Sequence, residues 1–200
     1  MLKKIFPIWF VMVLVLLWAS SSFACVGRIL YVGALDTPED KVISQLLVLL
    51  INERTGTSVK IRYFDDNQQL YGALQENDEE KRVDIIVENT EDALAILKKS
   101  RTGDLDQEYK QAKELYESDL GLIWLNPFGF THAADNQQQT VSAPLVRRDV
   151  LTNYPLLPRV LNKLSGAITD ETYTALTSKV RAGEKPKNVS KDFLRAKKFI

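Results

Sequence analysis

The chain has 200 residues, of which 45% are hydrophobic and 26% are charged, a composition typical of soluble globular domains. Its formal net charge is zero, and no cluster of basic residues stands out. A nucleic-acid-binding protein would carry such a cluster, so we expect no nucleic acid partner.

The N-terminal segment has the pattern of an export signal. Two lysines precede an apolar run over residues 5–19, and small residues then lead up to Ala24. The run is shorter than the roughly 20 residues that a membrane-spanning helix needs. We therefore predict a signal peptide over residues 1–24 and a mature chain that starts at Cys25. An uncleaved membrane anchor is the alternative.

Cys25 is the only cysteine, so no disulfide can form within the chain. Its place after the signal resembles the lipid-attachment site of bacterial lipoproteins, although Ser22 and Phe23 stand where leucine and a small residue are usual. Two alternatives stay open: lipidation at Cys25, and a soluble periplasmic chain with an unpaired thiol. Both place the protein in the periplasm or at the outer face of the bacterial inner membrane.

The next part of the chain alternates strand and helix patterns. An almost continuous apolar run over Arg28–Leu35 predicts a strand that is covered on both faces. A helix should follow from Pro38 to Gly56, with Thr37 as its N-cap. Alternating apolar and basic residues in Ser58–Phe64 predict a strand near a sheet edge.

Further strand and helix patterns follow, and Asn89 has the right spacing to Asp92 to cap a helix. Two more strands are predicted over 83–87 and 120–125, and helices over 67–76, 90–97, 105–116, 150–165, 169–182 and 189–197. Strands that alternate with helices indicate an α/β domain with a mainly parallel sheet flanked by helices.

Signatures of enzymes and of metal sites are mostly missing. His132 is the only histidine, which excludes sites built on several histidines and leaves any Ser-His-Asp arrangement dependent on one residue in a polar loop. None of the GxSxG, HExxH, P-loop and GxGxxG motifs occurs. We predict that the protein is not an enzyme and uses no cofactor and no metal.

In open α/β sheets, ligands bind in the crevice at the carboxyl ends of the strands, between the strand-to-helix loops. The predicted loops supply hydrogen-bonding groups and, in two of them, an aromatic ring. The residues predicted to bind a ligand are Asp36, Thr37, Glu88, Asn89, Thr90 and Phe128. The alternative role of Thr37 and Asn89, taken singly, is to cap a helix.

Several segments resemble the substrate-binding proteins of glycine betaine/choline/proline-type ABC transporters. The similarity is strongest in "APLVRRDVLTNYPLLPRVLNKLSGAITDETYTAL" followed by "VSKDFLRAKKFI", and "GLIWLNPFGF" adds to it. It covers nearly all of residues 26–200. The resemblance implies a type 2 periplasmic-binding-protein fold, whose two lobes close around a quaternary ammonium solute held by aromatic rings. It also implies an ABC permease, or another periplasmic or membrane protein, as the partner.

The second lobe of that family has no counterpart in this sequence. Where the family's chain would cross to the second lobe and return, only a short polar bridge follows Asn126–Thr131. We therefore predict a single lobe over residues 25–200, in which 125–146 is a fused crossover that replaces the second lobe. Leu125 and Val146 should then lie at or near the ends of strands.

The loops that carry the family's ligand motifs are also altered. Val87–Asp92 keeps a glutamate and a threonine of a Pro-Glu-Tyr-Thr-Gly-Thr-like loop, but Asn89 replaces the aromatic ring. A single open lobe leaves much of a ligand in water, whereas good sites bury about 70–90% of it. We expect weak or partner-dependent binding of a quaternary ammonium or related osmolyte. The alternative is a non-transport periplasmic interaction or accessory protein that has lost ligand binding.

Overall fold

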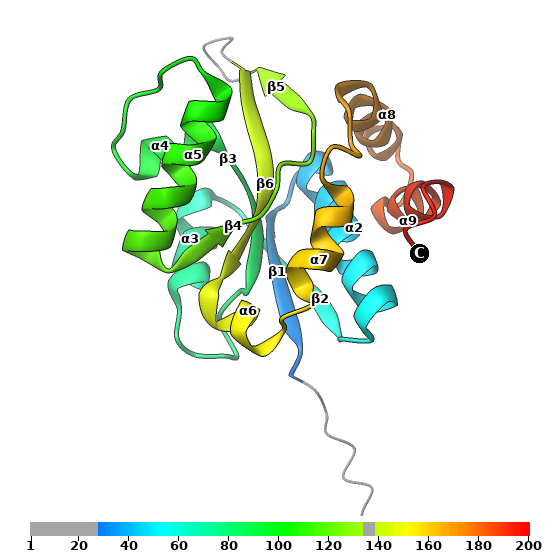
Figure 1. Ribbon diagram of the computed structural model, residues 1–200. Helices are drawn as coiled ribbons and strands as arrows, with labels where there is room; N and C mark the ends of the chain where they lie inside the picture. The colour runs from blue at the N-terminus through cyan, green and yellow to red at the C-terminus, as the bar shows by residue number, and fades with distance from the viewer. Residues whose placement is uncertain (1–27, 134–138) are drawn as a thin grey trace, which may run out of the picture.

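The computed structural model describes residues 28–133 and 139–200 (Figure 1). The predicted signal peptide, the lipidation site Cys25 and part of the predicted fused crossover lie outside the described residues. Among the described helices, none is long and apolar enough to cross a membrane.

The described strands form a sheet with the order β2-β1-β3-β6-β4. Their bounds are Leu30–Leu35 for β1, Val59–Phe64 for β2, Ile85–Asn89 for β3, Leu122–Trp124 for β4, Thr131–Ala133 for β5 and Gln139–Arg147 for β6. β1 runs parallel to β2 and β3, and β6 runs antiparallel to both β3 and β4. The strands β1, β2, β3 and β4 therefore run in one direction, as expected for a mainly parallel sheet. β2 lies at the edge of the sheet, as predicted.

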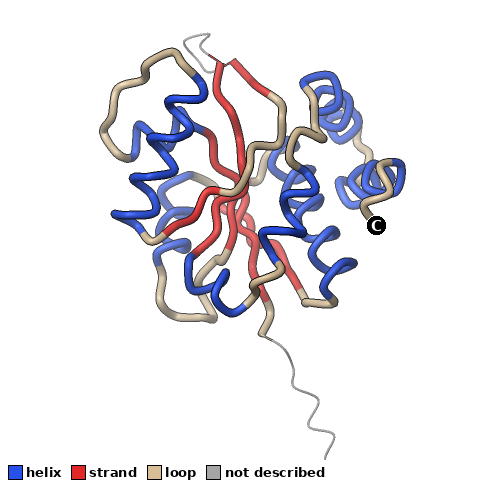
Figure 2. The backbone as a smooth tube through the Cα atoms, in the orientation of Figure 1, coloured by secondary structure: helices blue, strands red, loops and turns tan. Residues whose placement is uncertain are grey.

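Helices cover the sheet from both sides, as Figure 2 shows with the strands in red between two groups of blue helices. α3, α4 and α5 lie on one side, and α2, α7, α8 and α9 on the other (Figure 1). The helices before β4 are α2 Pro38–Thr55, α3 Asn67–Gln75, α4 Thr90–Ile96, α5 Leu105–Leu115 and the π-helical turn η2 Tyr116–Leu120. Those after β6 are α6 Arg148–Asn153, α7 Leu157–Leu161, the 3-10 turn η3 Asn162–Leu164, α8 Asp170–Arg181 and α9 Pro186–Ala196.

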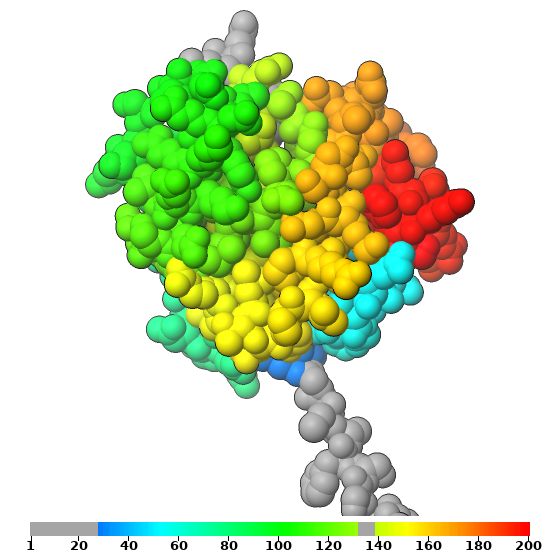
Figure 3. Space-filling view, viewed as in Figure 1, coloured from blue at the N-terminus to red at the C-terminus, as the bar shows by residue number. Residues whose placement is uncertain are grey.

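Each face of the sheet has its own hydrophobic core, because successive side chains of a strand point to opposite faces. On β3, Ile85 and Val87 pack in the core beneath α2, whereas Ile86 packs in the core beneath α3 and α5. Figure 3 shows the result from outside: the side chains of the flanking helices hide most of the sheet, and the blue N-terminal strand emerges only at the lower edge.

Helix caps follow the sequence closely. The Thr37 Oγ1 accepts a hydrogen bond from the Asp40 N–H at 3.1 Å and begins α2, which ends at Gly56 with φ of 69°. The Asn89 Oδ1 accepts from the Asp92 N–H at 2.9 Å and begins α4. Both predicted caps are confirmed.

The C-terminal helices differ from the prediction in one respect. The helix predicted over 150–165 is divided between α6, α7 and η3. Pro155 has no N–H and disfavours the helical conformation of the residue before it, and Tyr154 accordingly has φ of −126° and ψ of 69°. The apolar stripe of this segment still packs on the sheet, since Leu157, Leu161 and Leu164 are buried in the core beneath α2.

Residues 125–133, which follow β4, lie close to the sheet. As predicted, Leu125 directly follows β4 and Val146 lies one residue before the end of β6. Between them β5 pairs antiparallel with the start of β6, with Thr131 opposite Val141. The Gly129 loop packs on the turn that begins α8, because the Ile168 N–H donates to the Phe128 carbonyl at 3.3 Å.

Candidate functional site

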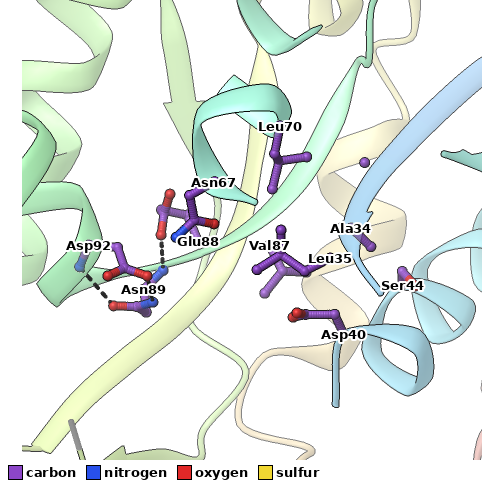
Figure 4. Close-up of a pocket in the computed structure, with 11 residues that line it drawn as sticks. Ala34, Leu35, Asp40, Ser44, Asn67, Leu70, Val87, Glu88, Asn89 and Asp92 are labelled. Carbon is purple, nitrogen blue, oxygen red and sulfur yellow. Dashed lines mark hydrogen bonds between the residues drawn. The ribbon is translucent and has the colours of Figure 1, made fainter. Parts of the chain in front are cut away.

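A cavity of about 130 Å³ opens where β1 and β3 end. Its apolar wall consists of Leu35, Leu70 and Val87. Its polar lining consists of Asp40, Ser44, Asn67, Glu88, Asn89 and Asp92. Figure 4 shows that the polar side chains approach from two sides: Asp40 and Ser44 come from α2, and the others from α3, β3 and α4. This is the carboxyl edge of the parallel strands, where ligands of open α/β sheets bind.

Two of the carboxylates are held by the residues that cap their helices. The Thr37 hydroxyl donates to the Asp40 Oδ2 at 2.8 Å, and the Asn89 Nδ2 donates to the Asp92 Oδ2 at 2.8 Å. A carboxylate in the first turn of a helix is favoured by the helix dipole. The caps therefore fix Asp40 and Asp92 at the rim of the cavity.

Glu88 is the buried carboxylate of the site, with 5% of its surface exposed. The alternation along β3 turns its side chain to the same face as Ile86, towards α3 and η2. There the Asn89 N–H donates to Oε1 at 2.7 Å, and the Tyr71 hydroxyl donates to Oε2. The Tyr71 hydroxyl also bonds the Tyr116 hydroxyl at 2.7 Å.

Burial raises the pKa of the Glu88 carboxyl to about 8. The hydrogen bonds from Tyr71 and Asn89 oppose this effect, while the neighbouring Asp92 and Asp40 add to it. Burial also raises the pKa of Asp40, and its hydrogen bond with Thr37 limits the increase. Both carboxyl groups therefore hold their protons more tightly than they would in water.

The wall behind Glu88 is aromatic and closely packed. The Tyr116 ring meets Trp124 edge-on with 5.7 Å between centroids, and Tyr109 meets the same indole at 5.8 Å. The Tyr109 hydroxyl donates to the Leu125 carbonyl at 2.7 Å. This packing holds Tyr71 and Tyr116, and through them Glu88, in one arrangement.

Gly33 lets α3 approach the end of β1. A Cβ at this position would lie 2.6 Å from the Leu70 Cδ1 and 3.1 Å from a Val83 methyl carbon. The glycine thus allows Leu70 to form the apolar wall of the cavity.

The lining carries negative charge and lacks a positive one. No lysine or arginine belongs to the lining among the described residues, and Lys41, the neighbour of Asp40, is paired with Asp36 outside the cavity. Within residues 28–133 and 139–200, no group of three or more histidine, cysteine, aspartate or glutamate side chains is placed to hold a metal ion.

The structure brings together two of the six residues predicted to bind a ligand. Glu88 and Asn89 line the cavity. Asp36 is exposed and paired with Lys41, and Thr37 serves as the cap of α2.

The other two predicted residues are buried elsewhere. Thr90 is fully buried, with its hydroxyl 2.8 Å from that of Thr140. Phe128 is also fully buried, in the core on the opposite face of the sheet, with its ring stacked on Phe130 at 5.9 Å. Thr90 and Phe128 therefore do not line the cavity, because their side chains pack into the interior of the fold.

Four polar lining residues were not predicted: Asp40, Ser44, Asn67 and Asp92. A signal for two of them is present in the sequence, because Asp40 and Asp92 each stand three residues after the cap of a helix that follows a strand. That spacing returns a side chain to the end of the strand. Ser44 lies one helical turn beyond Asp40, on the same face of α2.

Comparisons with known proteins agree with this fold. Residues 134–196 match the family described as the substrate binding domain of the ABC-type glycine betaine transport system. The match confirms the predicted resemblance in the C-terminal part of the chain. No curated protein matches the sequence.

Solved structures resemble a larger part of the chain. The crystal structure of a glycine betaine/carnitine/choline ABC transporter has a TM-score of 0.76 at 14% identity, over 85% of this chain and 99% of that one. Apo YehZ from Escherichia coli has a TM-score of 0.75 at 14% identity, over 87% and 100%. Lactococcal OpuAC, closed and complexed with glycine betaine, has a TM-score of 0.56 at 8% identity, over 86% and 97%. At these identities the likeness establishes the fold, and it confirms the predicted α/β fold class.

Proposed function

We propose that this chain is an exported solute-binding protein of an ABC transport system for quaternary ammonium or related osmolytes of the glycine betaine/choline class. The observation that carries the proposal is the acidic cavity where β1 and β3 end, lined by Asp40, Glu88 and Asp92. A cleft lined by one sign of charge concentrates solutes of the opposite sign. The similarity of residues 134–196 to a substrate binding domain supports the same role.

In this proposal residues 25–200 form a single lobe, with 125–146 as a fused crossover. The mature chain lies in the periplasm or at the outer face of the inner membrane and hands its solute to an ABC permease or to another periplasmic or membrane protein. Cys25 is either lipidated or free. Binding by the isolated chain is weak, because a cavity of about 130 Å³ is smaller than the roughly 300–1,000 Å³ of usual ligand sites.

Isothermal titration calorimetry of the purified protein tests the solute-binding role. Choline, glycine betaine, carnitine and proline are titrated singly into the folded monomer. We expect saturable heat with at least one of these solutes, and the loss of that heat in D92N. The D106N variant is the matched control, because Asp106 is exposed on α5, away from the lining of the cavity.

A second function has one observation in its favour. Phe128, the aromatic residue predicted to bind a ligand, and the nearby Phe130 are buried in the core and do not line the cavity. This placement suits a non-transport periplasmic interaction or accessory protein that has lost ligand binding. Absence of heat with every solute, from a chain whose folding is verified by circular dichroism, would favour this second function over solute binding.

A further inference from the structure

We propose that the cavity selects a small cation that carries N–H donors, such as a primary ammonium group, over a fully methylated ammonium. The inference rests on the proposed solute-binding function and specifies the chemistry of its ligand. It depends on what the lining offers to a cation, taken group by group.

The lining is rich in hydrogen-bond acceptors. A carboxylate has about four acceptor positions on its two oxygens. Glu88 is 5% exposed and receives one hydrogen bond on each oxygen, from Asn89 and from Tyr71. The fold raises the pKa of Glu88 and keeps it protonated near neutral pH, but a cation beside it favours the ionised form, and N–H donors of that cation could then fill the acceptor positions that remain.

Acceptors also face the cavity from its other sides. Asp40 comes from α2 and Asp92 from α4, so that the carboxylates approach from different directions (Figure 4). The side-chain oxygens of Ser44 and Asn67 add neutral acceptors. A primary ammonium has three N–H donors that point in different directions, which matches this distribution. A quaternary ammonium has none.

Aromatic faces, which hold methylated ammonium groups, do not line the cavity. A quaternary ammonium is bound by cation–π attraction to Trp, Tyr or Phe rings. Among the described residues that line the cavity, none carries an aromatic ring. Tyr71, the aromatic side chain beside Glu88, directs its hydroxyl to the carboxylate and to Tyr116.

The size of the cavity also favours a primary ammonium over a methylated one. A volume of about 130 Å³ admits a small head group, whereas each added methyl takes space and covers an acceptor. A buried acceptor that loses water without gaining a donor is destabilised. Methylation of the ligand nitrogen should therefore weaken binding through both the loss of donors and the increase in size.

Ethanolamine and choline make the matched pair for the test, because they differ only in the methyl groups on nitrogen. The dissociation constant of each is measured by isothermal titration calorimetry with the purified full chain at constant ionic strength. Methylammonium and tetramethylammonium form a second pair without the hydroxyl. We expect the dissociation constant of ethanolamine to be at least about tenfold lower than that of choline, because only ethanolamine can donate charge-assisted hydrogen bonds from its nitrogen.

Variants connect the selectivity to the cavity. D40N removes a carboxylate on the α2 side of the cavity, and D92N removes one on the α4 side. Each should raise the dissociation constant of ethanolamine by about fivefold or more. D106N makes the same substitution on the exposed face of α5 and should change nothing. The melting temperature of each variant, measured without ligand, identifies a variant that has lost its fold rather than its site.

Each outcome decides the proposal. Tighter binding of ethanolamine that depends on Asp40 and Asp92 supports it. Equal or tighter binding of choline overturns it and leaves the solute-binding function standing. Ethanolamine binding that is unchanged in both variants also overturns it, because the ligand then lies elsewhere. If no compound of either pair binds and the osmolyte titrations are also silent, the inference and the solute-binding function fail together.

Discussion

The Tyr71 hydroxyl donates a hydrogen bond to the buried Glu88 carboxyl group and thereby connects α3 to the end of β3. The two residues are 17 positions apart in the sequence, and the sheet brings them together. The same hydroxyl bonds Tyr116, which packs against Trp124. A polar group that lines the cavity is thus supported from behind by the core.

Replacing Tyr71 with phenylalanine removes that support. Glu88 Oε2 loses its donor, and Tyr116 loses a hydroxyl partner, while the ring volume stays. We expect Y71F to lower the free energy of unfolding by about 1–3 kcal/mol, as for other buried groups left without a partner. Urea unfolding measures the change.

Y63F is the matched control for this prediction. Tyr63 is 44% exposed on the edge strand β2. Removing the Tyr63 hydroxyl should leave the free energy of unfolding nearly unchanged. Equal stability of Y71F and Y63F would contradict the structural role assigned to the Tyr71 hydroxyl.

The stability of the protein should depend on pH through Glu88. Burial raises the pKa of this carboxyl from the ordinary 4.5 to about 8, so the folded state keeps a proton that the unfolded state loses. Its contribution to stability is complete below about pH 4.5 and is lost as the pH rises towards 8. One proton limits the slope to about 1.4 kcal/mol per pH unit.

The E88Q variant tests this sign. Glutamine stays neutral at every pH, so the decline in stability from about pH 5 to pH 8 should be smaller in E88Q than in the wild type. Chemical unfolding at a series of pH values measures the two curves. E53Q, an exposed glutamate of α2, should follow the wild type. Parallel curves for E88Q and the wild type would show that Glu88 is ionised in the fold over this whole range.

Gly129 should tolerate no side chain. Its φ is 113°, and a Cβ there would lie 2.7 Å from the Gly166 Cα. The loop that contains Gly129 and the turn that contains Gly166 are joined by a hydrogen bond, since the Gly166 N–H donates to the Pro127 carbonyl at 3.3 Å. G129A therefore forces the loop off the turn before α8, and we expect a loss of about 2–4 kcal/mol.

Gly166 provides the comparison for that loss. It also has a positive φ, of 63°, but a Cβ there would meet nothing within 4 Å. G166A should cost only the backbone strain, about 1–2 kcal/mol. Thermal unfolding of the two variants ranks them, and a G166A protein less stable than G129A would show that the close approach is unimportant.

The buried hydroxyls of Thr90 and Thr140 should be energetically coupled. They lie 2.8 Å apart, and Thr140 Oγ1 also accepts from the Glu91 N–H at 3.2 Å. T90V and T140V should each cost about 1–2 kcal/mol, because each removes the hydrogen bond between the two buried hydroxyls. The double variant should cost less than the sum, by about 0.5–1 kcal/mol.

Equilibrium unfolding of the wild type, both single variants and the double variant gives this coupling energy. Strict additivity would mean that the two hydroxyls act separately. The result also bears on the predicted ligand-binding role of Thr90, since a residue that only joins α4 to β6 should leave solute affinity unchanged when T90V remains folded.

Local features of the structure were predictable from the sequence. Thr37, Gly56 and Asn89 begin or end helices because their side chains or backbone preferences act on residues a few positions away. Such interactions are complete within one short segment. The edge position of β2 was likewise visible in the basic residues of its more exposed face.

Non-local features were not predictable in the same way. β6 runs antiparallel between β3 and β4. Pro144 lies opposite Val87, so the register with β3 is fixed by pairing between segments more than fifty residues apart. The burial of Glu88 against Tyr71 and of Phe128 against Phe130 depends on that register and on how the helices pack. A pattern of residue types shows which loops meet at the sheet edge, but the direction of each side chain follows from packing.

Chemical-shift mapping with a cationic solute is the most direct test of the central claim, that the cavity where β1 and β3 end binds a small cation. Nitrogen-15 spectra of the protein are recorded as ethanolamine and choline are added. We expect the amide signals of Leu35, Asn89 and Asp92 to shift in a saturable way, while those of α9 stay in place. Unchanged spectra at high solute concentration, or saturable shifts confined to residues outside the cavity, would contradict the account.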